Sequence, residues 1–169
     1  MKRLKRKPCL FCTWKDDLKK VQKELKKRPE DITIDDMALK FSACDNKPWK
    51  SQFITANKHF FAVLSNEPKI EGHTLIISRK HFSGIADSRL SAQKNEFRIA
   101  LFDIMIEMTR MLANITGAKR SSKVYVMSIC EHWKAKELDE AEKNYHTEHL
   151  HFHLLPRHKS IRVPYPHYV

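Results

Sequence analysis

A row of alternating histidines near the C-terminus constrains the fold of this chain more than any other segment. Residues 149–155 read His-Leu-His-Phe-His-Leu-Leu. Because successive side chains of a β-strand point to opposite faces, His149, His151 and His153 would share one face and the apolar residues between them the other. A helix would scatter the three imidazoles around its axis. The segment therefore predicts a strand with one core-facing side and one side that carries three histidines.

Further strands and helices are predicted around this segment. Runs rich in β-branched and aromatic residues predict strands over residues 53–55, 59–64, 72–77, 123–130 and 150–155. Apolar residues at helical spacing predict a helix over 16–28, with Asp16 and Asp17 in its first turn, and a long helix over 91–114. Thr33 and Asp36 form a capping box for a short helix over 33–41. This order favours an α+β domain with an antiparallel sheet.

The composition is that of one ordinary folded domain. The chain has 169 residues, of which 41% are hydrophobic and 31% are charged, with only 3 glycines. These values exclude a disordered or collagen-like chain. No apolar run has the length of a membrane span, and the basic N-terminus is not followed by the apolar stretch of a secretory signal. We therefore expect a soluble protein of the cytoplasm or another intracellular compartment.

Positive charge is concentrated at the N-terminal end. Residues 1–50 hold 15 basic and 8 acidic side chains, a net charge of +7, against 17 and 12, a net charge of +5, in residues 51–169. This balance favours an anionic partner such as a nucleotide or a nucleic acid, although a solvated basic surface is the simpler explanation. We expect residues 1–50 to form a basic arm with a helical insertion, packed on a main domain over 51–169.

The three histidines allow more than one role. Residues two apart on a strand are separated by about 6.5–7 Å, so the outer pair is about 13 Å apart. Since a Zn–N bond is only about 2.1 Å long, one ion cannot bind both His149 and His153, although it could bridge two neighbours. The central imidazole, His151, could instead be a neutral nucleophile whose tautomer is fixed by its neighbours. Three solvated histidines are the structural alternative.

The motif His-x-His-x-His with apolar x resembles the signature of the histidine triad (HIT) superfamily. Residues 72–81, Gly-His-Thr-Leu-Ile-Ile-Ser-Arg-Lys-His, resemble the family's Gly-His-Thr-Leu strand, and Leu155-Pro156-Arg157 fits the sequence that follows the triad. The resemblance covers residues 53–158, and the Cys9/Cys12 pair extends it to the start of the chain. It implies an α+β fold with an antiparallel meander sheet and one long helix, often assembled as a homodimer.

The resemblance also implies a reaction at the α-phosphate of a nucleotide derivative. His151 would be the nucleophile and would form a nucleotidyl-histidine intermediate, from which water releases a nucleoside monophosphate. His153 and His149 would polarise and orient the site, and His73 would support them from the neighbouring strand. The transferase branch carries Gln at the third triad position, so a histidine there favours hydrolysis. Substrates would be dinucleoside polyphosphates, nucleoside phosphoramidates or adenylyl conjugates.

A structural zinc ion is the second implication of the resemblance. Cys9 and Cys12 alone have the spacing of a zinc half-site or of a redox pair. Many bacterial-type members of the family bind Zn²⁺ through such a pair, the histidine that ends the Gly-His strand and the first triad histidine. The matching residues are Cys9, Cys12, His81 and His149, a normal closed Cys₂His₂ set. The alternative is two free thiols and an unrelated surface His81.

The sequence departs from the family pattern at several positions. The hydroxyl that normally precedes the triad and assists the leaving group is replaced by His146, with Thr147 as an alternative hydroxyl. The residue that usually holds the ribose falls at Ser65, with Asn66 beside it. The charged stretch 131–143, a loop or short helix, is longer than usual and would lie beside the pocket.

Three functions remain compatible with the sequence. The first is a nucleotide hydrolase of the HIT type. The second is a nucleic-acid-directed member that removes adenylyl groups, for which the basic N-terminal half is the motivation. The third is a nucleotide-binding protein without useful turnover, motivated by the missing hydroxyl before the triad. Labelling of His151, salt-dependent nucleic-acid binding and nucleotide binding without product release distinguish them.

Overall fold

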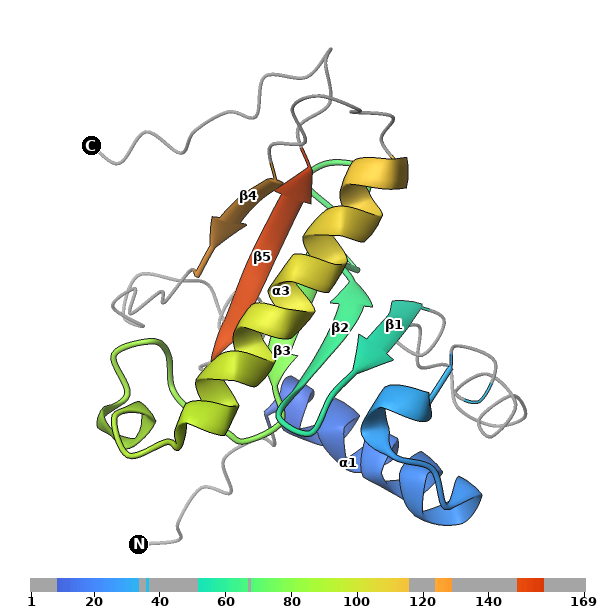
Figure 1. Cartoon of the computed structure of the whole chain (residues 1–169), viewed down its shortest axis with the longest axis vertical. Coiled ribbons are helices and arrows are strands. Elements are labelled where there is room, and N and C mark those ends of the chain that lie inside the picture. Colours follow the sequence, from blue (N-terminus) through green and yellow to red (C-terminus); the bar gives the residue numbers. More distant parts are fainter. Residues whose placement is uncertain are drawn as a thin grey trace, which may run out of the picture.

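Five antiparallel strands form a sheet with one helix on each face (Figure 1). The computed structural model describes residues 9–33, 36, 52–66, 68–115, 124–128 and 149–156, to which all structural statements refer. The strands are β1 (Phe53–Ala56), β2 (Phe60–Leu64), β3 (Thr74–Ser78), β4 (Val124–Met127) and β5 (His151–Pro156), in the order β1-β2-β3-β5-β4. The helices are α1 (Leu10–Leu25) and α3 (Asn95–Ile115), with short 3₁₀ turns at Pro29–Asp31 and Ser88–Leu90.

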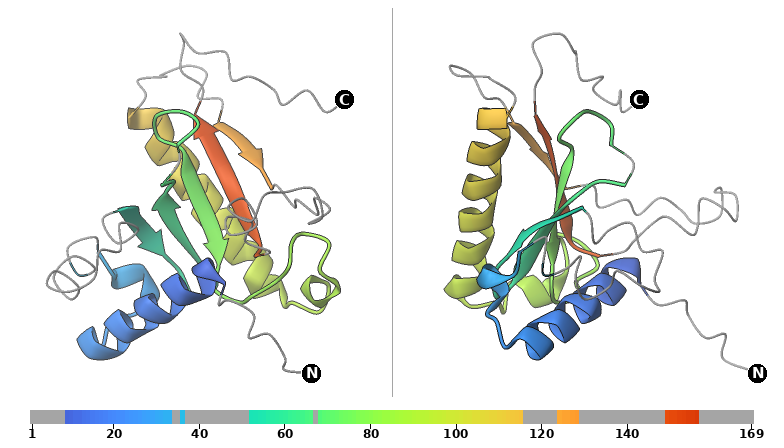
Figure 2. Two further views of the ribbon diagram at one scale, coloured as in Figure 1. Left: turned by 180° about the vertical axis from the view of Figure 1, so that it is seen from behind. Right: turned by 90° about the vertical axis from the view of Figure 1, so that its right-hand side faces the viewer.

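The long helix α3 covers one face of the sheet (Figure 2). Its apolar stripe packs with β2, β3 and β5 in one buried cluster. The cluster contains Phe60, Ala62, Ile76, Phe82, Phe97, Ile104, Met108, Leu112, Leu150, Phe152 and Leu154. Leu150, Phe152 and Leu154 are the apolar residues between and beside the histidines, so the predicted core-facing side of that segment is confirmed.

Helix α1 packs on the opposite face of the sheet, near one end (Figure 2). The cluster beneath it contains Phe11, Trp14, Leu18, Val21, Ile32, Phe53, Ala56, Phe61, Val63, Leu75 and Ile77. In the β3–β5 pair, Leu75 lies opposite His153 and Ile77 lies opposite His151. Because paired residues of an antiparallel sheet point to the same face, the histidines lie on the side of the sheet that α1 occupies.

The α+β class with an antiparallel sheet is confirmed, whereas the limits predicted for the N-terminal helix are wrong. Helix α1 begins at Leu10, well before residue 16, and it ends at Leu25, where Lys26 has a left-handed φ of 55°. Asp17 therefore lies inside the helix and is buried, 3% exposed, instead of stabilising a first turn. The acidic pair misled the prediction because acidic residues are favoured at helix starts in general.

Other elements differ from the prediction by a few residues. Strand β5 begins at His151, so His149 lies in the bend before it, and α3 begins at Asn95 after the 3₁₀ turn Ser88–Leu90. The capping box is present, since the backbone N–H of Thr33 donates to Asp36 and that of Asp36 to the Thr33 hydroxyl, at 2.8 and 3.2 Å. The rest of 33–41 and the stretch 131–143 lie outside the described residues. None of the helices described has the length and apolarity to cross a membrane.

Gly72 sets the entry into β3 and thereby the place of His73. Its φ is +76°, a conformation that residues with a Cβ rarely adopt. A Cβ at this position would also lie 3.1 Å from Cγ of Pro156 and 3.3 Å from Cδ2 of Leu112. The glycine of the Gly-His-Thr-Leu motif is therefore required both by the backbone conformation and by the close approach of β5 and α3.

Candidate active site and metal centre

Four imidazoles form a continuous row on the α1 side of the sheet. His149 lies just before β5 and is 2% exposed, and His151 and His153 follow on the strand. The ring centroids of His151 and His153 are 4.9 Å apart, and that of His73, just before β3, lies 5.1 Å from His153. The predicted common face of the triad is thus extended by His73, which is buried at 3% exposure.

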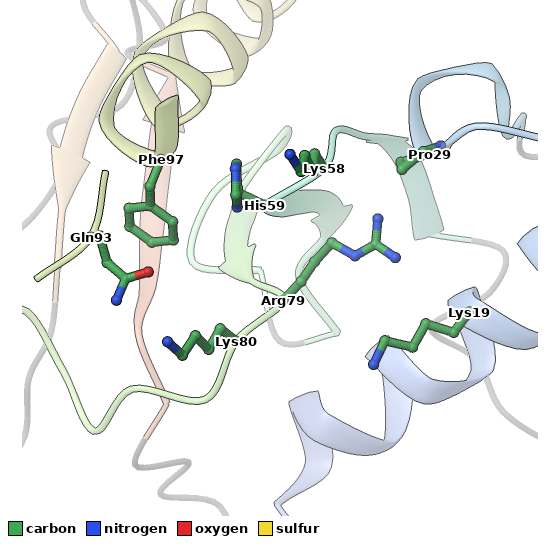
Figure 3. A pocket seen from close by; sticks show the side chains of 8 residues that line it. All are labelled: Lys19, Pro29, Lys58, His59, Arg79, Lys80, Gln93 and Phe97. Carbon is green, nitrogen blue, oxygen red and sulfur yellow. The ribbon is translucent and has the colours of Figure 1, made fainter. Parts of the chain in front are cut away.

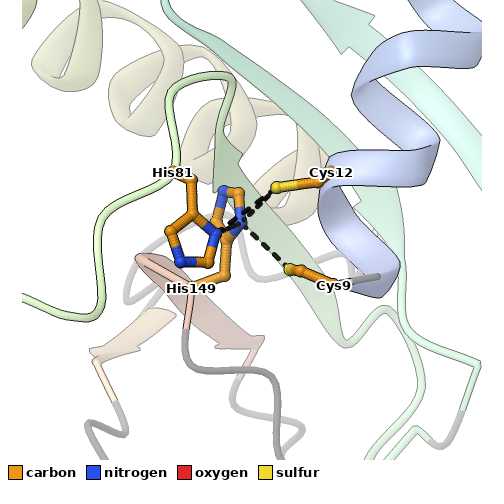
Figure 4. A group of neighbouring side chains, drawn as sticks. All are labelled: Cys9, Cys12, His81 and His149. Carbon is orange, nitrogen blue, oxygen red and sulfur yellow. Dashed lines mark hydrogen bonds between the residues drawn. The ribbon is translucent and has the colours of Figure 1, made fainter. Parts of the chain in front are cut away.

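His149, at one end of the row, also belongs to a group of four cysteine and histidine side chains that could bind a metal ion, called here the metal-ligand group (Figure 4). Cys9 and Cys12 come from the start of α1, His81 from the segment after β3, and His149 from the bend before β5. One ligand atom of each residue lies within 4.8 Å of those of the other three. These are the four residues that the sequence resemblance selected, and the fold brings them together from three distant segments.

The distances between these ligand atoms fit a tetrahedral zinc ion. With Zn–S bonds of about 2.3 Å and Zn–N bonds of about 2.0–2.1 Å, a tetrahedron separates two nitrogens by about 3.3 Å and a nitrogen from a sulfur by about 3.6 Å. Nδ1 of His149 lies 3.2 Å from Nδ1 of His81, 3.4 Å from Sγ of Cys9 and 3.6 Å from Sγ of Cys12. Sγ of Cys12 lies 3.3 Å from Nδ1 of His81, and the other two of the six separations are within 4.8 Å. The donor set therefore fits a metal ion.

The protonation states of this group also suit a cation. Nε2 of His149 lies 2.6 Å from the carbonyl of Ser78, which can only accept, so Nε2 carries the proton and Nδ1 presents its lone pair to the group. Burial lowers the pKa of His149 to about 4, which keeps the ring neutral. Burial and the neighbouring Cys9 raise the pKa of Cys12 to about 11, so the thiolate form needs a positive charge beside it.

The backbone fixes the tautomer of His151. Its Nδ1 lies 2.6 Å from the carbonyl oxygen of His149. Because a carbonyl only accepts, Nδ1 donates and Nε2 is left with the lone pair. His151 is half-buried and sits between the metal-ligand group and His153. The arrangement therefore orients the imidazole of His151 and places the lone pair of its neutral form on Nε2.

A chain of hydrogen bonds fixes His153 in the opposite tautomer. The backbone N–H of Lys69 donates to Nδ1 of His73 at 3.2 Å, so the proton of His73 is on Nε2. This Nε2 donates to Nδ1 of His153 at 2.9 Å. His153 consequently carries its proton on Nε2 and presents a donor where His151 presents a lone pair. Burial lowers the pKa of His153 to about 3, with a further contribution from His151.

The sequence model of the HIT domain matches residues 46–160 of the chain. The chain belongs to the HIT domain family. The match spans the five strands, α3 and the histidine row, and it confirms the resemblance inferred from the triad and the Gly-His-Thr-Leu strand. Among curated proteins, none matches this chain.

Solved structures resemble this HIT domain at low sequence identity. A HIT-family protein of Bacillus subtilis is 15% identical, with a TM-score of 0.50 over 91% of this chain and 76% of that one. Diadenosine triphosphate hydrolase of Plasmodium falciparum is 13% identical, with a TM-score of 0.47 over 87% and 86% of the two chains. A hypothetical protein of Leishmania major is 18% identical, with a TM-score of 0.43 over 62% of each chain. This chain therefore matches less than two thirds of the length of the Leishmania protein. At 15% identity the likeness to the Bacillus subtilis protein shows the fold alone.

Phe11 is a site residue of this HIT domain that the sequence analysis missed. It lies between the two cysteines and is 5% exposed. Its ring packs edge-on against the rings of His149 and His151, with centroid distances of 5.7 and 5.2 Å. The start of α1 therefore covers the first two histidines with an aromatic side chain. The apolar pair inside the Cys-Leu-Phe-Cys motif was the available signal, but it could not say which residue enters the site, because Leu10 is 48% exposed and only Phe11 is buried.

The remaining candidates of the sequence analysis differ in how far the structure describes them. Ser65 follows β2, and its backbone N–H donates to the carbonyl of His73 at 2.9 Å, so Ser65 and Asn66 lie at the His73 end of the row. His146 and Thr147 lie outside the described residues. The HIT site thus runs from the metal-ligand group through the triad to the residues selected for ribose binding.

The depressed pKa of His153 predicts an acid dependence of stability. The unfolded chain binds a proton at this histidine below about pH 6.5, whereas the folded chain does so only near pH 3. Stability should therefore fall as the pH drops between these values, by up to about 1.4 kcal/mol per pH unit from this group. Urea unfolding of wild type and of His153→Gln at several pH values measures the difference in slope. Equal slopes would contradict the prediction.

Proposed function

We propose that this HIT protein hydrolyses nucleotide derivatives by attack of His151 on the α-phosphate. The observation that carries the proposal is the pair of opposite tautomers in the row. The His149 carbonyl, 2.6 Å from Nδ1 of His151, leaves the lone pair of the ring on Nε2, and the His73–His153 bond of 2.9 Å leaves an N–H on His153 for a phosphoryl oxygen. A nucleophile and a donor therefore stand side by side on one face.

The reaction divides into two displacements. In the first, Nε2 of His151 forms a bond to the α-phosphorus as the bond to the leaving group breaks, and the Nδ1–H bond to the His149 carbonyl stabilises the positive charge on the ring. In the second, water attacks the phosphorus, the P–N bond breaks, and a water proton goes to solvent. The products are a nucleoside monophosphate and the protonated leaving group.

Other residues of the proposed site are assigned by the family resemblance and by position. His146, with Thr147 as the alternative, would supply the proton to the leaving group. Ser65 and Asn66 would hold the ribose, because they stand at the His73 end of the row. The substrate classes that fit this assignment are dinucleoside polyphosphates, nucleoside phosphoramidates and adenylyl conjugates.

The ion proposed for the Cys9, Cys12, His81 and His149 group is structural Zn²⁺. The four side chains would supply all the ligands of a tetrahedral ion, and a closed site of this kind would leave no coordination position for substrate. When bound, the ion would neutralise the two thiolates and hold the start of α1 against the bend before β5. Thiolate ligands are maintained in a reducing compartment, which supports an intracellular location.

A single-turnover experiment tests the proposed function. The protein is incubated with adenylyl compounds labelled at the α-phosphate, one from each of the three classes. We expect a transient covalent label on the protein, stable to base and labile to acid as phosphoramidates are, followed by release of labelled AMP. Nucleotide binding without label or product from any compound would favour the alternative of a binding protein without turnover.

A homodimer is proposed on an exposed apolar face of α3. Ile99, Phe102 and Ile106 are 59%, 65% and 46% exposed, and their spacing places them on one side of the helix. Asp103, Glu107 and Arg110 lie beside this stripe, so in an antiparallel pair of α3 helices the Arg110 side chain of each copy could meet an acidic side chain of the other. A second copy of the chain is therefore the occupant that fits this face.

Substituting this face is expected to give a monomer. In Phe102→Glu/Ile106→Glu, two charges would be buried at the proposed interface at a cost of several kcal/mol, so the dimer should dissociate. Light scattering coupled to size exclusion measures the mass, with exposed Lys20→Gln on α1, on the other face of the sheet, as the control. A wild-type mass of one chain of about 20 kDa at all concentrations would overturn the dimer.

A further inference from the structure

A cleft with a cationic lining lies beside the first turn of α3, apart from the histidine row (Figure 3). Its volume is ≈ 340 Å³. Its lining residues are Lys19, Pro29, Lys58, His59, Arg79, Lys80, Gln93 and Phe97. They come from α1, the 3₁₀ turn that follows it, the β1–β2 turn, the segment after β3 and the start of α3. None of the eight is acidic and none belongs to the triad or to the metal-ligand group.

Arg79 is the fixed cation of this cleft. Its guanidinium donates to the carbonyl of Asn57 at 3.1 Å and to the side-chain oxygen of Gln22. Both acceptors are neutral, and the side chain is half-buried, so its orientation is fixed without a carboxylate partner in these two bonds. The side chain is thus oriented at the cleft while its charge has no carboxylate hydrogen bond among the described residues. A bound anion would supply the missing negative charge.

The other polar groups of the cleft are compatible with an anion. Nε2 of His59 is buried without a hydrogen-bond partner in the described part of the chain. Two carboxylates lie near the cleft. Glu96 forms ion pairs with Lys58 at 2.8 Å and with His59 at 3.8 Å, and Glu30 attracts the charge of Arg79 electrostatically. Both are about half exposed and do not line the cleft, so four lining cations face two peripheral carboxylates.

We propose that this cleft binds successive phosphate groups of a linear oligophosphate or phosphodiester chain. Four cations from three separate segments, α1, the β1–β2 turn and the segment after β3, are more than one phosphate group needs, so a chain of phosphates fits this lining better. A nucleic-acid strand and a free oligophosphate share this chemistry. The cleft is separate from the α-phosphate site at His151, so it adds a second anion site to the proposed function and does not depend on it.

Titration with sodium tripolyphosphate tests the cleft in the wild-type protein and in two matched variants. Lys19→Gln/Lys58→Gln removes two cleft charges and the exposed Lys58–Glu96 pair. The control, Lys20→Gln/Lys23→Gln, removes two charges of α1 that lie outside the cleft, together with the Lys20–Asp17 ion pair. Each variant therefore loses two positive charges and one ion pair. Calorimetry at about 50 mM and about 200 mM salt measures the affinity. Thymidine oligonucleotides of about 4 and about 12 nucleotides replace tripolyphosphate in a second arm.

The expected result is a loss of affinity of about tenfold or more in the Lys19/Lys58 variant and less than about twofold in the control. Affinity that rises with oligonucleotide length identifies a strand as the ligand, and binding of tripolyphosphate alone identifies a free oligophosphate. Equal losses in both variants, or no binding by wild type at low salt, would overturn the proposal. Covalent labelling of His151 should be unchanged in both variants, so failure of the cleft is distinguishable from failure of the hydrolase.

Discussion

Replacing His151 by alanine is expected to abolish both the covalent label and the release of nucleoside monophosphate. The variant removes the imidazole whose Nε2 is proposed to attack, and His153 cannot replace it with Nδ1, because that lone pair already accepts from His73. Loss of a nucleophile typically lowers kcat by about 10³-fold or more. Single-turnover release of labelled AMP, followed for wild type and variant at saturating substrate, measures the effect.

A pair of controls separates chemistry from folding in this experiment. His151→Asn keeps a polar side chain in the row and should be equally inactive, whereas Arg98→Gln on the opposite face of the sheet should label like wild type. The metal content of all variants should stay the same, because His151 is not a ligand of the group at Cys9 and Cys12. Undiminished AMP release by His151→Ala would exclude the nucleotidyl-histidine mechanism.

The face of the sheet on which the histidines lie could be predicted because a strand has a two-residue period. Leu150, Phe152 and Leu154 had to face the core, and the histidines were thereby placed on the other side. The gathering of Cys9, Cys12, His81 and His149 followed from the family resemblance, not from spacing. Their sequence separation exceeds anything that local pattern can predict.

The tautomers and the second anion site could not be predicted in this way. The proton position on His151 depends on one carbonyl, and that on His153 depends on a chain through His73 to the backbone of Lys69. The cationic cleft likewise combines Arg79 with lysines of distant segments, whose approach is set by tertiary packing. The composition indicated that residues 1–50 are basic, but not that Lys19 would line the same cleft as Arg79.

The start of α1 connects the metal-ligand group to the row of histidines. Cys9 is the N-cap and Cys12 lies in the first turn, so both sulfurs reach the same side of the helix. Phe11, between them, makes edge-on ring contacts with His149 and His151. An ion bound to the four ligands would therefore order the helix and the two histidines together. Loss of the ion should loosen α1 before it affects α3 on the other face.

Removal of the metal is expected to destabilise the protein and to release the start of α1. If free zinc exceeds its dissociation constant by about 1,000-fold, binding contributes about 4 kcal/mol, which lowers the Tm of a domain of this size by about 8–16 °C when the ion is removed. Thermal melts before and after chelation measure the shift. Hydrogen exchange should increase in residues 10–25 and stay unchanged in residues 95–115.

The test variant is Cys12→Ser, which replaces a thiolate by a poor zinc ligand. The control is Thr13→Ser, which changes the next residue of the helix and leaves the four ligands in place. Zinc content should fall from one ion per chain to almost none in the first and stay at one in the second. Restoring zinc to the chelated wild type should recover both the Tm and the protection of α1. Equal protection of α1 with and without the ion would show that Phe11 and the apolar cluster hold the helix alone.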